Sequence, residues 1–94
     1  MHSEPFREPV TVYLRHPDGI MRPTALSSTR EAYTALMGGD RVNVADPAWQ
    51  IAFDDTVRAL LDPKPEKVEA SRRALERLAN LRASADPDKR RTLH

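Results

Sequence analysis

The chain has 94 residues, which is enough for one modest hydrophobic core and too few for two. Its 15 basic and 14 acidic residues leave a formal net charge of +1, which excludes the strong positive field of a typical polyanion-binding protein. Because the chain has no cysteine, disulfides and cysteine-based zinc sites are also excluded.

The first predicted element is a strand over residues 9–15, where apolar side chains alternate with others at a period of two. Its apolar face consists of Val10, Val12 and Leu14. Its opposite face consists of Thr11, Tyr13 and Arg15, which are candidate contact residues for a partner. The next four residues, His16-Pro17-Asp18-Gly19, favour a type I turn with a left-handed glycine, so the chain should reverse there.

A returning strand is predicted over residues 20–26, and Pro23, which lacks a backbone N–H, confines it to an edge of the sheet. Both outer edges of a two-stranded hairpin carry unpaired backbone groups. The first strand has no proline between Val10 and Arg15. Unless another segment of the chain covers its outer edge, that edge is available to pair with a second copy and form a homodimer.

The first helix is predicted over residues 29–37. Ser28 and Glu31 match a capping box, in which the serine hydroxyl and the glutamate carboxylate accept hydrogen bonds from amides at the helix start. The apolar face of this helix consists of Ala32, Tyr33, Leu36 and Met37. Gly38 and Gly39 then provide a left-handed stop.

The second helix is predicted over residues 47–61, with Asp46 as its N-cap. Residues 40–45 before it are interpreted as a loop, and the alternation of Val42 and Val44 with polar residues leaves a very short third strand as the alternative. The apolar residues of the second helix are Trp49, Ala52, Phe53, Val57, Leu60 and Leu61.

The third helix is predicted over residues 65–82, and its buried stripe consists of Val68, Ser71, Ala74, Leu75, Leu78 and Ala79. Residues 1–8 are expected to be a flexible N-terminus and residues 83–94, which lack an apolar period, a disordered tail. The sequence therefore predicts one α+β domain over residues 9–82, in which a two-stranded antiparallel hairpin precedes three helices.

Several of these positions carry a resemblance to a known family. They are Phe6, Pro9-Val10, Arg22-Pro23, Ser27 through Glu31-Ala32-Tyr33, Leu36, Ala52, Val57 and Arg73-Ala74. Over about residues 6–82 the pattern resembles the domain-of-unknown-function family 982, small proteins of rhizobia and related bacteria. The chain has Gly38-Gly39-Asp40-Arg41 where members of that family usually carry a Trp-Pro pair. The resemblance implies a bacterial cytoplasmic protein of uncharacterised function and supplies no catalytic residues.

Side chains that could carry chemistry have simpler structural explanations. His16 and Asp18 could form an acid–base pair, but both also fit the predicted turn. Asp54 and Asp55 are adjacent on a helix, so they point about 100° apart rather than toward one substrate. The one internal histidine is too few for a catalytic zinc site. We therefore expect no enzyme activity, no cofactor and no metal.

Basic residues of the third helix raise the alternative of a nucleic-acid-associated protein. Arg72 and Arg73 lie three or four residues from Glu69 and Glu76, a spacing that predicts intrahelical ion pairs rather than a free basic surface. Only Lys89-Arg90-Arg91 forms an unpaired basic cluster, and three charges attract phosphates weakly. We expect nucleic-acid binding less than protein binding.

Two residues of the second helix bear on a contact surface. Trp49 is interpreted as a core residue, with an interface role as the alternative because tryptophan is enriched among interface hot spots. Ile51 faces away from the apolar stripe and should be exposed. We therefore expect a non-catalytic protein-interaction or regulatory module, with another protein or a second copy as its partner.

The location is expected to be cytoplasmic. The first residues lack the basic and apolar segments of a signal peptide. No apolar run approaches the roughly 20 residues that cross a bilayer, so no membrane partner is expected.

Overall fold

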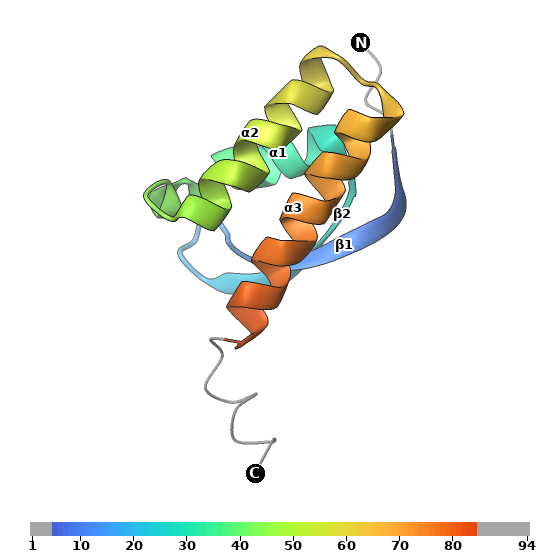
Figure 1. The fold of residues 1–94 in the computed structure, drawn as a ribbon. Coiled ribbons are helices and arrows are strands. Elements are labelled where there is room, and N and C mark those ends of the chain that lie inside the picture. Colours follow the sequence, from blue (N-terminus) through green and yellow to red (C-terminus); the bar gives the residue numbers. More distant parts are fainter. Residues whose placement is uncertain (1–4, 85–94) are drawn as a thin grey trace.

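Two strands, three α-helices and one 3₁₀ helix make up the part of the chain that the structure describes, residues 5–84 (Figure 1). In this computed structural model the elements are, in chain order, β1 (Pro5–Arg15), β2 (Met21–Ser28), α1 (Thr29–Met37), η1 (Gly39–Asn43), α2 (Pro47–Leu61) and α3 (Pro65–Ser84). The predicted α+β fold, a two-stranded antiparallel sheet followed by three helices, is confirmed. Residues 1–4 of the expected flexible N-terminus and residues 85–94 of the expected disordered tail lie outside the described residues.

The hairpin turn forms as predicted. β1 and β2 pair in antiparallel register, with Val10 opposite Leu26. At the turn the Gly19 amide donates a hydrogen bond to the His16 carbonyl at 2.8 Å. Gly19 has a φ of 86°, the left-handed conformation that the predicted turn requires of its glycine.

β1 begins at Pro5 rather than at residue 9. Phe6 gives the physical reason, since its side chain is buried in the core and holds the chain against the rest of the domain. The register is irregular between Pro5 and Val10, as at a β-bulge. Residues 5–8, which the sequence analysis assigned to a flexible N-terminus, therefore extend the strand.

α1 begins at the predicted cap. The Ser28 hydroxyl accepts a hydrogen bond from the Glu31 amide at 3.2 Å, and the Glu31 carboxylate accepts one from the Ser27 amide at 2.7 Å. The predicted left-handed stop is wrong, because Gly38 has a φ of −78° and Gly19 is the only described residue with a positive φ.

The 3₁₀ helix η1 replaces most of the loop predicted over residues 40–45, and the alternative third strand does not form there. Gly39 opens η1 where it meets the hairpin. A Cβ at Gly39 would lie 2.6 Å from the Arg15 carbonyl oxygen and closer still to the His16 carbonyl, so only glycine allows this approach. The next residue, Asp40, is fully buried.

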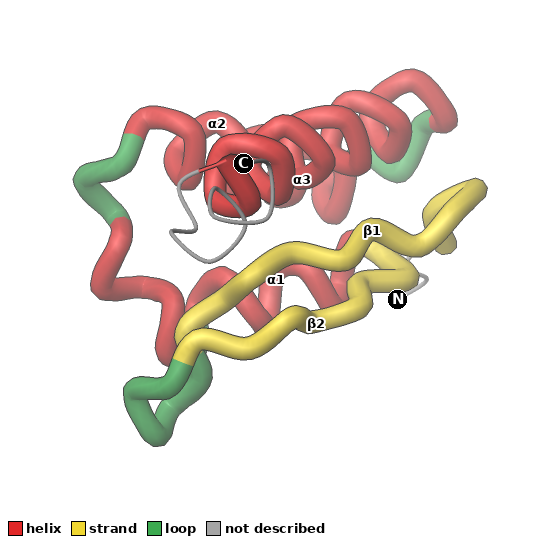
Figure 2. Tube along the Cα trace, turned by 90° about the horizontal axis from the view of Figure 1, so that it is seen from below, coloured by secondary structure: helices red, strands yellow, loops and turns green. Residues whose placement is uncertain are grey.

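The domain has two layers. Figure 2 shows α2 and α3 side by side in one layer and the hairpin with α1 in the other. The buried apolar residues between the layers are Phe6, Val10, Val12, Leu14, Leu26, Ala32, Leu36, Trp49, Ala52, Ala59, Val68, Leu75 and Leu78. The prediction for the second helix is wrong at Leu61, which is 81% exposed, while Thr56 and Ala59 are buried instead. None of the helices within residues 5–84 has the length and apolar character needed to cross a membrane.

Candidate functional site

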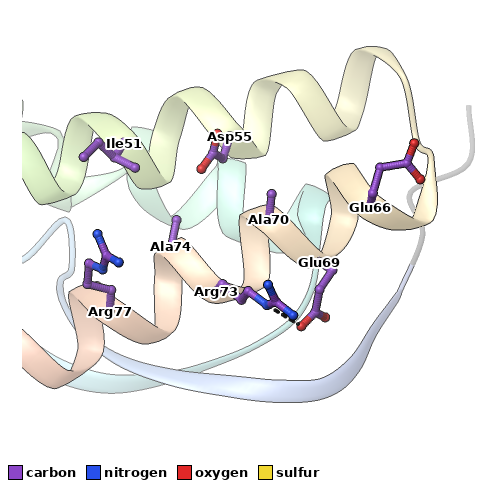
Figure 3. A pocket seen from close by; sticks show the side chains of 8 residues that line it. All are labelled: Ile51, Asp55, Glu66, Glu69, Ala70, Arg73, Ala74 and Arg77. Carbon is purple, nitrogen blue, oxygen red and sulfur yellow. Dashed lines mark hydrogen bonds and ion pairs between the residues drawn. The ribbon is translucent and has the colours of Figure 1, made fainter.

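A hollow runs along the outer side of α2 and α3 (Figure 3). Its volume is about 410 Å³. It is lined by Ile51, Asp55, Glu66, Glu69, Ala70, Arg73, Ala74 and Arg77, and we call it the α2–α3 groove.

Helical spacing brings the α3 residues of the groove onto one surface. Glu66, Ala70, Arg73 and Arg77 recur at intervals of three or four residues, so they share one side of the helix. Ala70 and Ala74 lie along the middle of the groove, and their small side chains leave it open. The groove therefore has a small apolar floor between charged side chains.

A buried polar contact fixes α2 against α3. The Thr56 and Ser71 hydroxyl oxygens lie 2.7 Å apart, and the Thr56 hydroxyl donates to the Ala52 carbonyl at 2.7 Å. Because a hydroxyl has one proton, Ser71 is the donor in the pair. At the turn between the helices, Lys67 donates to the Asp62 carboxylate at 2.8 Å. These contacts give the groove a defined shape before any partner binds.

The charges of the groove are separated along its length. Figure 3 places Arg77 beside Ile51 at one end and Glu66 at the other. Asp55, on α2, lies between these ends. Within residues 5–84, Asp55, Glu66 and Arg77 take part in no ion pair. Both ends of the groove therefore present charges that the described part of the domain leaves available.

The other charged residues of α3 are paired with one another, as the sequence spacing predicts. Arg72 donates to Glu69 at 2.7 and 2.9 Å and to Glu76 at 2.8 Å, and Arg73 donates to Glu69 at 3.2 Å. The hydrogen bonds from Arg72 lower the pKa of Glu69 from 4.5 to about 2. The same contacts raise the pKa of Arg72. The arginines that suggested nucleic-acid binding are thus held by carboxylates of their own helix.

The two predicted contact residues of α2 differ in their surroundings. Ile51 is 49% exposed and lines the groove, as expected of a residue off the apolar stripe. Trp49 is 3% exposed and stacks on Phe53 with ring centroids 5.0 Å apart. Trp49 is therefore a core residue, and the alternative interface role for it has no exposed surface to act through.

The predicted contact residues of β1 lie at the hairpin. Thr11 and Tyr13 are exposed and Arg15 is half-buried. The Arg15 amide donates to Asp40 Oδ1 at 2.8 Å, and Arg82 Nη1 donates to the Tyr13 carbonyl at 2.6 Å. Two backbone groups that pairing with another strand would use are therefore already bound within the domain.

The side chains at the hairpin tip serve the turn. The Asp18 carboxylate accepts from the Ile20 amide at 3.0 Å and from Arg22 at 2.6 Å, and these bonds lower its pKa. His16 Nε2 lies 3.0 Å from the Thr24 hydroxyl oxygen. His16 and Asp18 thus each contact a different group, and the acid–base pair that their spacing suggested does not form.

Among the groove residues, Ile51 is predicted from the sequence as a contact residue, but the charged residues are not. Glu66 and Arg77 lie on the exposed, polar side of α3, and their position beside α2 depends on how the two helices pack. The spacing of Glu66, Ala70, Arg73 and Arg77 on one side of a helix was the signal that could have identified them.

Comparison with known proteins finds no matching family model, no matching curated protein and no matching solved structure. The resemblance to the domain-of-unknown-function family 982 therefore stays a prediction. Within residues 5–84, no three His, Cys, Asp or Glu side chains are grouped so that they could hold a metal ion.

Proposed function

We propose that this chain is a non-catalytic protein-interaction module of the cytoplasm and that its binding surface is the α2–α3 groove. One observation carries the proposal. In a single hollow, the exposed Ile51 lies together with three charged residues that take part in no ion pair within residues 5–84, namely Asp55, Glu66 and Arg77.

This combination suits a protein partner. Protein interfaces join an apolar centre to a polar rim, and the charges of the rim determine which partner is accepted and in which orientation. In the groove, Ala70 and Ala74 provide the apolar centre, and Ile51 adds apolar surface at the Arg77 end. Glu66 and Arg77 provide the rim, with opposite charges at opposite ends. Such a surface selects one orientation of its partner.

The acidic residues of the groove disfavour nucleic acid as the partner. Asp55, Glu66 and Glu69 line the same hollow as Arg73 and Arg77, so a phosphate backbone would meet at least as many carboxylates as guanidinium groups. Protein partners with mixed charges meet no such repulsion.

Site-specific photo-cross-linking in the cells that make the protein tests this proposal. A benzoylphenylalanine in place of Ile51 should form adducts with protein, since this side chain lines the groove. The matched control replaces Val42, which is 68% exposed and lies on η1, away from the groove. We expect protein adducts at position 51 and few at position 42. Equal adducts at the two positions, or adducts with nucleic acid alone at position 51, would contradict the proposal.

A further inference from the structure

We infer that the partner at the α2–α3 groove is a second copy of this chain, and that the two grooves face each other with their α3 helices antiparallel. This inference rests on the proposed function, since it names the partner of the same surface. It replaces strand-edge pairing, because the Tyr13 carbonyl and the Arg15 amide on the outer edge of β1 are already bound by Arg82 and Asp40.

Two charged residues of the groove, Glu66 and Arg77, are complementary to each other under a two-fold rotation. Glu66 and Arg77 lie on the same side of α3, and eleven residues of helix separate them by about 16 Å. A two-fold axis midway between them places Glu66 of each copy opposite Arg77 of the other, so the same ion pair forms twice. An interface between identical surfaces must be self-complementary in this way. A parallel arrangement would instead oppose like charges at both ends.

The middle of the groove suits close approach at the axis. Ala70 and Ala74 lie there, and small side chains allow helices to pack at a short distance.

The overall charge of the chain allows this pairing. A formal net charge of +1 per copy produces little long-range repulsion between two copies. Orientation is then determined by the local charges of the groove rather than by the total charge.

Sedimentation equilibrium of the full chain over a wide concentration range provides the test, with Arg77→Glu, Glu66→Arg and the double variant compared with wild type. Both positions are exposed, so the variants should fold, and circular dichroism checks this. Arg41→Glu is the matched control, because Arg41 is an exposed arginine of η1 outside the groove.

Wild type should show a monomer–dimer equilibrium. In each single variant, two pairs of like charges face each other across the interface. This should weaken dimerisation about tenfold or more. The double variant restores both pairs with reversed polarity and should return close to wild type, and an equimolar mixture of the two single variants should form heterodimers. Arg41→Glu should behave as wild type.

Two results would overturn the inference: a wild-type chain that stays monomeric at several hundred micromolar, or a double variant that dimerises as weakly as the single variants. A different result would contradict the proposed function, so the two proposals can be distinguished. If wild type is monomeric while position 51 still cross-links to a different protein, the groove remains an interaction surface and only its assignment to a second copy is wrong.

Discussion

Arg82, near the end of α3, holds both carboxylate oxygens of the buried Asp40, with Nη1 2.9 Å from Oδ1 and Nη2 3.0 Å from Oδ2. Asp40 also accepts from the Arg15 amide at 2.8 Å and from Asn43 at 3.1 Å. Arg82 donates in addition to the Tyr13 carbonyl. One ion pair therefore connects the last helix, the 3₁₀ helix and the outer edge of β1, and several hydrogen bonds compensate the buried charge.

Replacing Arg82 with alanine should destabilise the domain by about 3 kcal/mol or more, because Asp40 would remain buried without its partner. Denaturant titration measures the effect. A matched pair of truncations isolates it, since a chain that ends at Ser84 keeps Arg82 and one that ends at Leu81 lacks it. We expect the first to melt within a few degrees of full length and the second to lose much of its stability. Equal stability of the two truncations would show that the ion pair matters little.

Gly39→Ala should destabilise by about 1–3 kcal/mol, because its Cβ would meet backbone atoms of Arg15 and His16, which cannot rotate aside as the end of a flexible side chain could. The control is Val42→Ala on the same 3₁₀ helix, where the side chain is exposed and its loss should change stability little. Thermal unfolding of both variants decides the matter. A Gly39→Ala variant as stable as Val42→Ala would mean that η1 can move away from the hairpin without cost.

Thr56→Val should cost about 1–2 kcal/mol, since it removes the acceptor of the buried Ser71 hydroxyl without changing the size of the side chain. Ser71→Ala should have a similar effect. The double variant leaves neither hydroxyl in place and should therefore be more stable than the sum of the single effects predicts. Denaturant titration measures the free energy of unfolding of each variant. If the loss in the double variant equals the sum of the losses in the single variants, the two hydroxyls do not depend on each other.

The domain should become less stable in acid, because protonation removes the charge of its ion-paired carboxylates. The pKa of Glu69 is lowered from 4.5 to about 2 in the folded chain. Its ionised form therefore contributes fully to the free energy of unfolding above about pH 4.5, and this contribution is lost as the pH falls toward 2. The pKa of Asp62 is lowered in the same direction, mainly by its hydrogen bond from Lys67. Glu69→Gln should reduce the melting temperature at neutral pH. The difference in melting temperature between this variant and wild type should shrink on acidification. A difference that stays constant with pH would contradict this assignment.

Local patterns predicted the elements well, because each depends on residues that are close in sequence. The Ser28 cap, the left-handed Gly19 and the start of α2 at Pro47 all form as predicted. The stripe of α3 is confirmed at Val68, Ser71, Leu75 and Leu78, which are buried, whereas Ala74 and Ala79 are only partly buried. These features follow from helical spacing, capping and turn geometry, which a single sequence displays directly.

Contacts between distant residues were not predictable in the same way. Asp40 and Arg82 are 42 positions apart, and no local pattern marks a buried ion pair between them. Gly39 is a second example. Glycine is required at this position because the residue approaches the hairpin backbone closely, and not because its φ is positive. The α2–α3 groove also depends on packing, because its charged residues read as an ordinary solvated helix surface until α2 lies beside them.

Thiol cross-linking tests the antiparallel pairing of the two grooves most directly, because the chain has no cysteine and each variant then carries a single thiol. Ala70→Cys lies near the proposed two-fold axis. Leu81→Cys is the control, since an axis midway between Glu66 and Arg77 places the two copies of position 81 about 28 Å apart along the helices.

With a short bis-maleimide, we predict that Ala70→Cys gives a covalent dimer at a concentration where wild type is dimeric and that Leu81→Cys does not. Adding Arg77→Glu to Ala70→Cys should reduce the yield of this product at the same concentration. Efficient dimers from both cysteine variants, which a parallel pairing would produce, or from neither, would contradict the account.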